Sequence, residues 1–180
     1  MKTTFLISAL AIGLAALIAA QSASAAPTFC VSVLSKRQGN LVTAPEPGKC
    51  LPGNFEGLSF SLGVARNGLA GSPTAMRQYT AFKVKKAWSA SSTKLFSAFT
   101  SSDELLQVVI VFFAQDPATG QEAVGHTITL KNALLTAIDY SSDVQDGTRS
   151  PATETLSIVF STIELVDTVT QSMAVDSVRP

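Results

Sequence analysis

Apolar and polar side chains alternate with a period of two along most of the chain beyond residue 28. A segment with this pattern buries one face and exposes the other, as a β-strand does when it covers a core. The alternation slips once, near Asn132–Ala133, where we expect a β-bulge within a single long strand. The pattern predicts strands at residues 29–34, 58–64, 79–87, 124–138 and 156–165.

Two segments depart from simple alternation. Residues 105–114 are apolar at nearly every position, which predicts a strand covered on both faces, either by a helix and the opposite sheet or by a neighbouring subunit. The turn at Asp116–Gly120 then predicts an antiparallel hairpin with the next strand. The serine-rich stretch Trp88–Thr93 carries helix N-cap residues and precedes apolar residues at helical spacing, so we expect a helix of about ten residues there.

These elements predict an all-β fold, an antiparallel β-barrel or sandwich of about six to seven strands with one short flanking α-helix. The polar stretch 141–153, with Gly147 and Pro151, is expected to be a loop. We expect one domain at residues 26–168 and a flexible C-terminal tail at residues 169–180.

The first 25 residues have the features of a Sec signal peptide. Lys2 gives a basic start, residues 5–20 form an apolar run, and Ala23 and Ala25 form an A-x-A cleavage box. A retained membrane anchor is the alternative, but the run is short for a span. We expect cleavage after Ala25 and a secreted or periplasmic protein with no stable membrane anchor.

Composition narrows the choice of partners. The whole chain has 13 basic and 13 acidic residues, and loss of Lys2 with the leader leaves 12 basic residues against 13. A near-neutral protein without a basic block is a poor candidate for binding nucleic acid or an anionic membrane.

Cys30 and Cys50 are the only two cysteines. In a chain bound for an oxidising compartment they predict a disulfide, which would stabilise the fold by roughly 3 kcal/mol on the chain-entropy estimate. A metal site or a redox couple is the alternative, but the spacing is not C-x-x-C and no further thiol or nearby histidine completes a zinc site.

Candidate chemistry is sparse. His126, the only histidine, lies in mid-strand on an apolar face, and the sequence assigns it no acidic partner. Ser91-Ser92-Thr93-Lys94 spells the S-x-x-K of penicillin-recognising enzymes without the companion motifs. Asp139, Asp143 and Asp146 form the densest acidic stretch, but their spacing fails the EF-hand pattern. We therefore expect no enzyme, no catalytic residue, no bound metal and no cofactor.

Taken in order, the elements resemble the haemolysin-coregulated protein (Hcp) family, the tube proteins of type VI secretion systems. The resemblance lies in an opening strand pair, a lysine-bearing strand that leads into a serine-rich cap and a short helix, a long hairpin, and a closing strand introduced by a glutamate. These stretches are residues 31–39, 56–64, 82–86, 89–101, 108–113, 127–138 and 154–165.

The resemblance implies a compact β-barrel, hexameric homo-oligomeric rings, stacking of the rings into a hollow tube that carries effectors, and no cofactor. Its implied partners are further copies of the chain and effector or secretion-apparatus proteins. The leader would make the chain a Sec-exported variant. One alternative is a secreted binding module for a glycan or a surface partner, with Trp88 and Tyr140 as its exposed aromatics. Another is a secreted hydrolase that depends on His126.

Overall fold

The computed structural model describes residues 29–67, 76–115, 119–142, 144–145, 148–149 and 151–178. The expected signal peptide at residues 1–25 lies outside these ranges. Within them, no helix has the length and the apolarity needed to cross a bilayer.

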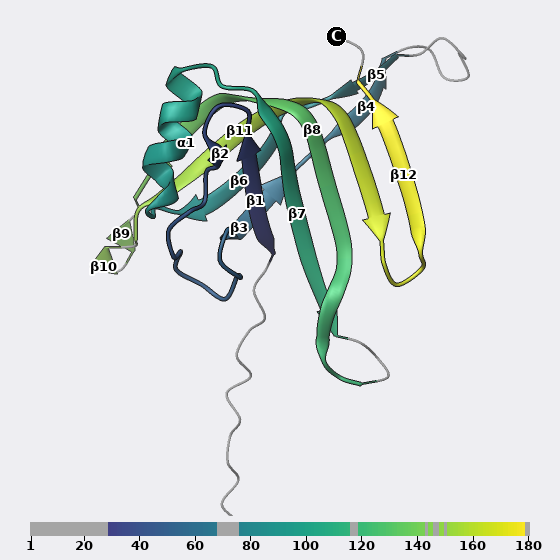
Figure 1. Cartoon of the computed structure of the whole chain (residues 1–180), viewed down its shortest axis with the longest axis horizontal. Helices are drawn as coiled ribbons and strands as arrows, with labels where there is room; N and C mark the ends of the chain where they lie inside the picture. The colour runs from purple at the N-terminus through teal and green to yellow at the C-terminus, as the bar shows by residue number, and fades with distance from the viewer. Residues whose placement is uncertain are drawn as a thin grey trace, which may run out of the picture.

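Six antiparallel strands close into a barrel, which confirms the predicted fold class (Figure 1). The strands follow one another around the ring in the order β11, β6, β3, β1, β7 and β8, and β8 pairs back with β11. Their bounds are β1 Cys30–Ser35, β3 Phe55–Ser61, β6 Phe82–Ala87, β7 Leu105–Gln115, β8 Glu122–Ser141 and β11 Thr153–Asp167.

The remaining elements decorate this ring. Helix α1 (Ser91–Thr100) covers one end of the barrel, and β12 (Ser172–Ser177) lies at the opposite side of the molecule as an edge strand on β11 (Figure 1). The short strand β2 (Gly39–Asn40) pairs with β1, and two small hairpins project from the barrel. The hairpins consist of β4 (Val64–Asn67) with β5 (Met76–Tyr79), and β9 (Val144–Gln145) with β10 (Thr148–Arg149).

Side chains from every barrel strand fill the interior. Leu95 and Ala98 of α1 close one end of this core with almost no exposed surface. Gly57 of β3 is needed for close packing, because a Cβ there would lie 1.9 Å from Cε2 of the Phe29 ring. The largest buried apolar side chains are Phe29, Phe55, Phe82, Leu41, Leu95, Leu105, Ile110, Leu130, Leu156 and Ile158.

The β-bulge predicted at Asn132–Ala133 is not at these residues, because the pairings of β8 with β7 and β11 keep one register through them, although the buried face of the strand does change there. Asn132 has a positive φ of 48°, and the buried positions change there from Leu130 to Ala133 and Leu135. The pairing with β11 shifts register only afterwards, between Ser157 and Ile158 of β11. The strand thus changes its buried face at the residue that adopts the left-handed conformation.

Two predicted strands are wrong in their extent. The strands expected at 58–64 and 79–87 are each divided, because the chain turns out of the barrel at Gly63 and Thr80. The Gly63 N–H donates to Thr80 Oγ1 at 2.8 Å, and the Thr80 N–H donates to the Gly63 carbonyl at 2.9 Å. These bonds fix a corner from which the β4–β5 hairpin leaves the ring.

The expectation of a flexible tail at 169–180 is also wrong over Ser172–Ser177. This segment forms β12, whose six residues pair in register with Thr162–Asp167 of β11. Its alternation was too short and too polar to stand out in the sequence, and β11 supplies the backbone partner that it needs. Residues 179–180 lie outside the described ranges, as do residues 116–118 of the expected hairpin turn. Part of the expected 141–153 loop forms the small β9–β10 ladder.

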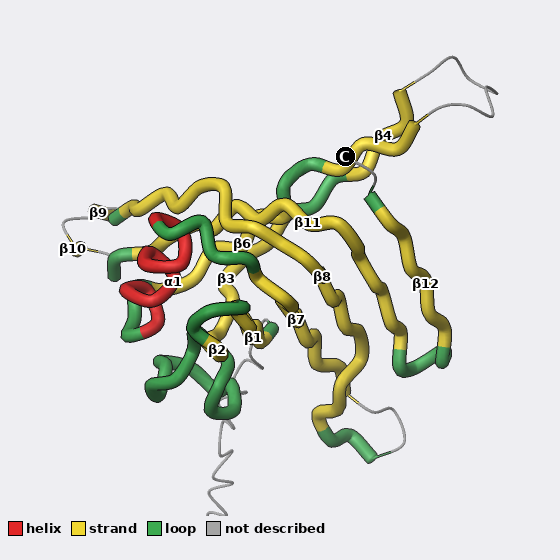
Figure 2. Tube along the Cα trace, turned by 45° about the horizontal axis from the view of Figure 1, so that its top comes forward, coloured by secondary structure: helices red, strands yellow, loops and turns green. Residues whose placement is uncertain are grey.

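The loop at residues 41–54 packs beside the start of α1 (Figure 2). The predicted disulfide is present: Cys30 in β1 is bonded to Cys50 in this loop, with their Cα atoms 5.6 Å apart. The Ser91 N–H donates to Glu46 Oε1 at 2.8 Å, so a carboxylate from the loop caps the helix. The N-cap position is Ala90, which has no side-chain cap, and the prediction that the serines cap α1 is therefore wrong.

Candidate functional site

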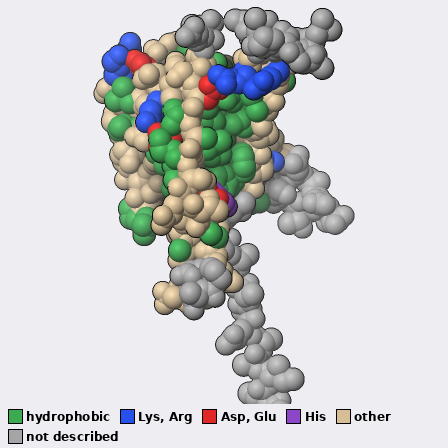
Figure 3. All heavy atoms as spheres, turned by 90° about the vertical axis from the view of Figure 1, so that its right-hand side faces the viewer, with side chains coloured by type: hydrophobic (Ala, Val, Ile, Leu, Met, Phe, Trp, Pro, Cys, Tyr) green, Lys and Arg blue, Asp and Glu red, His purple; other side chains and the backbone are tan. Residues whose placement is uncertain are grey.

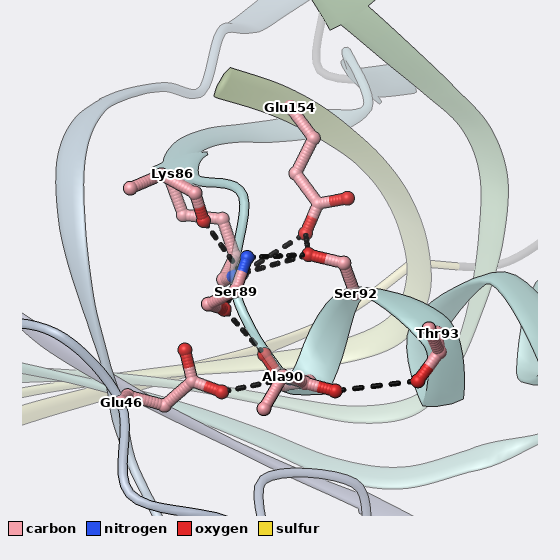
Figure 4. Close-up of polar contacts among 9 residues, drawn as sticks. Glu46, Lys86, Ser89, Ala90, Ser92, Thr93 and Glu154 are labelled. Atoms are coloured by element: carbon pink, nitrogen blue, oxygen red, sulfur yellow. Dashed lines mark hydrogen bonds and ion pairs between the residues drawn. The ribbon is translucent and has the colours of Figure 1, made fainter. Parts of the chain in front are cut away.

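A buried polar cluster, Lys86, Glu154, Ser89 and Ser92, lies where α1 begins (Figure 4). Lys86 Nζ lies 3.0 Å from Glu154 Oε1 and 2.6 Å from Ser89 Oγ, and it also donates to the Ala87 carbonyl. Ser92 Oγ donates to Glu154 Oε1 at 2.8 Å and accepts the Ser89 N–H at 3.0 Å. The lysine and the glutamate side chains are 1% and 0% exposed, so this ion pair has almost no contact with water.

The barrel brings these residues together from distant parts of the chain. Glu154 pairs with Lys86 across β11 and β6 and with Tyr140 across β11 and β8. Cross-strand partners share a face of the sheet, so the carboxylate lies between the lysine and the tyrosine. Glu154 Oε2 is buried and has no hydrogen-bond partner among the described residues.

Next to this cluster is a second feature, the aromatic pocket, formed by Trp88, Phe96 and Tyr140 with Ser92 and Thr93. Its volume is about 270 Å³, and the rings of Trp88 and Tyr140 are 4.8 Å apart at 39°. The structure thus places side by side the two aromatics singled out for the binding-module hypothesis. Burial, and after it the negative charge of Glu154, raises the pKa of Tyr140.

The S-x-x-K residues do not form a catalytic pair. Lys94 Nζ donates to Thr43 Oγ1 at 2.8 Å on the surface, away from the serines. The lysine that does contact a serine of this motif is Lys86, whose Nζ lies 3.4 Å from Ser92 Oγ. Ser92 is 1% exposed, which leaves little room for a substrate at its hydroxyl.

His126 is exposed and does have an acidic neighbour, which the sequence could not assign. Its Nδ1 lies 3.8 Å from Oδ1 of Asp167 on β11. Both residues border the β12 groove, an apolar hollow of about 420 Å³ between β8, β11 and β12 that also contains Ile128, Leu165 and Met173. Asp139 is exposed on β8, while Asp143 and Asp146 lie outside the described ranges. Across those ranges, no three His, Cys, Asp or Glu residues cluster as a metal site would require.

Apolar side chains gather on the face that carries β12 (Figure 3). Met173 and Val175 of β12 share one face of the strand and are 65% and 53% exposed. Leu165 of β11, the cross-strand partner of Ala174, lies on the other face of this strand pair and is 44% exposed. Phe60 of β3 is also 44% exposed, although its ring contacts those of Phe29, Phe82 and Phe112. The salt bridge between Arg77 and Asp176 ties the β4–β5 hairpin to one end of this face.

Sequence reasoning missed the Lys86–Glu154 pair as a unit, although a signal was present. Lys86 continues the alternation of Phe82 and Val84, and Glu154 that of Leu156 and Ile158, so each charge falls on the apolar face of its strand. A buried charge needs a partner of opposite charge. A lysine and a glutamate that both fall on buried positions are therefore expected to form an ion pair with each other.

The fold and the site define a small closed β-barrel with a helix at one end, a buried structural ion pair and an exposed apolar edge. The model of the family described as "Type VI secretion system effector, Hcp" matches residues 52–166, which is more than half of the chain. The chain belongs to the Hcp family of type VI secretion systems.

Solved structures share this fold at low sequence identity. A structure described as that of Hcp protein has a TM-score of 0.71 and 16% identity, and the alignment covers 83% of this chain and 98% of the other. The secreted protein Hcp3 from Pseudomonas aeruginosa has a TM-score of 0.70 and 16% identity, and its alignment covers 84% of this chain and 98% of the other. Hcp1 from the E. coli EAEC 042 pathovar has a TM-score of 0.66 and 14% identity, and its alignment covers 84% of this chain and 98% of the other. No curated protein matches the chain.

Proposed function

We propose that this protein is a structural subunit that resembles the tube protein of type VI secretion systems. It assembles into hexameric rings and carries effectors rather than catalysing a reaction. The family match over residues 52–166 is the observation that carries this proposal. The closed six-stranded barrel with its flanking helix supports it, because the solved Hcp structures have the same fold.

The exposed edge of β12 supports self-association. The strand pairs with β11 on one side only, and Met173 and Val175 stand on the same outer face. An edge strand with exposed apolar side chains is a template for pairing with another chain. Assembly would cover this edge and remove apolar surface from water.

The molar mass of the purified, oxidised protein in solution tests the proposal. Multi-angle light scattering should give six times the mass of one chain, and negative-stain images should show rings. The double variant Met173→Lys/Val175→Lys should shift the mass toward the monomer, while Leu51→Lys, at a loop residue that is 78% exposed, should not. A wild-type protein that stays monomeric at high concentration would contradict the proposal.

Export is part of the same proposal. We propose that residues 1–25 direct the chain through the Sec pathway, so that the ring forms outside the cytoplasm from a chain that begins at Ala26. The mass of the protein recovered from a periplasmic fraction should correspond to cleavage after Ala25. An intact Met1 in that fraction would exclude processing at this site.

A secreted binding module is the second candidate, and the aromatic pocket favours it. Exposed Trp88 and Tyr140 offer the kind of surface that recognises ligands by stacking. A glycan array screened with the wild type and with Trp88→Ala tests the carbohydrate form of this candidate, since a true sugar site should lose its signal in the variant.

A further inference from the structure

The aromatic pocket leaves three large aromatic side chains partly exposed to solvent. Trp88, Phe96 and Tyr140 are 51%, 49% and 42% exposed. Because the rings of Trp88 and Tyr140 lie only 4.8 Å apart, they form one continuous wall. The faces of aromatic rings carry negative charge density, so a wall of this kind attracts both apolar groups and cations.

A buried carboxylate lies behind this wall. Glu154 is the cross-strand neighbour of Tyr140 on one side and of Lys86 on the other. Oε1 takes the hydrogen bonds from Lys86 and Ser92, whereas the other carboxylate oxygen points away from Lys86 (Figure 4). Along the register the carboxylate of β11 therefore lies between the lysine of β6 and the tyrosine of β8, which places the negative charge nearer to Tyr140 than the positive one.

The field of this carboxylate reaches the wall of the pocket. Burial raises the pKa of Tyr140, and the charge of Glu154 raises it further. Burial disfavours a charge of either sign, whereas the smaller contribution, the negative charge of Glu154, disfavours a phenolate and favours a cation at the same place. The electrostatics of the pocket thus complement a cation.

The serine and threonine hydroxyls of the pocket are already hydrogen-bonded, so a sugar would have to rely on the Tyr140 hydroxyl and the Trp88 N–H. Ser92 Oγ already donates to Glu154 and accepts the Ser89 N–H, and Thr93 Oγ1 donates to the Ala90 carbonyl. A sugar needs several hydrogen-bonding partners when it leaves water. An alkyl cation needs only the aromatic rings and the negative charge of the Glu154 carboxylate to be stabilised in the pocket.

We propose that the aromatic pocket binds an alkylammonium group, carried either by a lysine side chain or by a free amine, with its methylenes against the Trp88–Tyr140 wall. The rings and the buried Glu154 carboxylate stabilise the charge. This site is independent of β12, so it serves a ring subunit and a monomeric module equally.

Fluorescence tests the proposal directly, because Trp88 is the only tryptophan of the chain. The purified protein is titrated with n-butylammonium chloride at constant ionic strength, and with n-butanol and methyl glucoside as neutral probes. We expect saturable binding of the amine that is about tenfold tighter than that of the alcohol. Nα-acetyl-lysine methylamide distinguishes the two sources: binding equal to that of butylammonium indicates a lysine of a polypeptide, and loss of binding indicates a free amine.

Two variants keep Trp88 as the reporter. Phe96→Ala should weaken amine binding by about fivefold through loss of a pocket wall, while Met173→Ala, on β12 at the other side of the barrel, should leave it unchanged (Figure 1). Equal affinity for amine and alcohol, binding of the glucoside alone, or no saturable signal would each overturn the proposal. None of these results depends on the molar mass, so failure here and failure of ring assembly are separate outcomes.

Discussion

Lys86 and Glu154 are charged residues at positions that the alternation of their strands assigns to the core. Their side chains are 1% and 0% exposed, and the Lys86 ammonium also lies 5.1 Å from the centre of the Phe55 ring. Ser89 and Ser92 add hydrogen bonds to Lys86 Nζ and Glu154 Oε1, while Glu154 Oε2 has no partner among the described residues. Such a pair contributes little net stability when intact, but the loss of one member leaves a buried charge without a counterion.

The Lys86→Met variant should therefore lose about 3–5 kcal/mol of unfolding free energy, measured by urea denaturation. Glu154→Leu should lose a comparable amount. The double variant Lys86→Met/Glu154→Leu should recover a large part of this loss, because both charges are then absent.

Lys83→Met is the matched control, since Lys83 is an exposed lysine of the same strand, and its effect should stay within about 0.5 kcal/mol. A double variant no more stable than either single variant would argue against a coupled pair.

Among the elements, the loop at residues 41–54 and helix α1 form one structural unit. The disulfide holds the loop to β1, the loop presents Glu46 to the Ser91 N–H, and Thr43 accepts a hydrogen bond from Lys94. A carboxylate at the N-terminus of a helix also interacts favourably with the helix dipole. The covalent bond between two segments therefore supports the helix that closes the core.

Replacing both cysteines, Cys30→Ser/Cys50→Ser, should lower the unfolding free energy by roughly 3 kcal/mol, because the unfolded chain regains the freedom of the closed loop. Glu46→Gln should cost less, about 0.5–1 kcal/mol. Urea denaturation with and without dithiothreitol measures both effects. The wild type should lose stability in the reductant and the double variant should not; a wild type indifferent to reductant would contradict the prediction.

The carboxylate of Asp167 accepts hydrogen bonds within the turn between β11 and β12. It accepts the N–H groups of Val169 at 2.8 Å and Thr170 at 3.1 Å. The backbone bond from Thr170 is the largest cause that lowers the pKa of Asp167 below 3.8, and His126 adds a smaller effect in the same direction.

Because the folded pKa lies below the unfolded one, the stabilisation is complete above the unfolded pKa and is lost as the pH falls through the folded value. Wild type and Asp167→Asn should therefore differ in urea midpoint near pH 6, and the difference should shrink near pH 3. An equal difference at the two pH values would show that ionisation of this carboxyl does not stabilise the turn.

Considered as a whole, the molecule has little net charge and an exposed apolar face around β12. The sequence carries 13 basic and 13 acidic residues. Attraction between oppositely charged surfaces is thus a weak source of assembly, whereas burial of apolar side chains is available at Met173 and Val175. The proposed ring should therefore depend on the hydrophobic effect.

Raising the sodium chloride concentration from about 0.1 to about 1 M, which shortens the Debye length from roughly 10 to 3 Å, should leave the molar mass of the assembly unchanged or increase it. Light scattering at both concentrations measures this. Dissociation at high salt would indicate that charged contacts hold the subunits together.

The sequence predicted the type of nearly every barrel element, and the errors have identifiable causes. The alternation in β8 and β11 is long, so those strands were found, but the bulge expected at Asn132 lies between Leu135 and Ala137. Strand β12 is short, with only three apolar residues, and was taken for a tail. Of the candidate site, Trp88 and Tyr140 were recognised as exposed aromatics, but Lys86 and Glu154 were not recognised as partners because they are 68 residues apart.

Local backbone geometry decides which side chains along a strand share a face. This geometry is determined by residues that are neighbours in the chain. Strand and helix types, and an antiparallel β-rich fold, were therefore evident from the order of residues. Closure of β8 onto β11, the contact of Glu154 with Lys86 and Ser92, and the pairing of Trp88 with Tyr140 were decided only in the folded barrel. They depend on which distant segments become neighbours, and that is settled by packing of the common core.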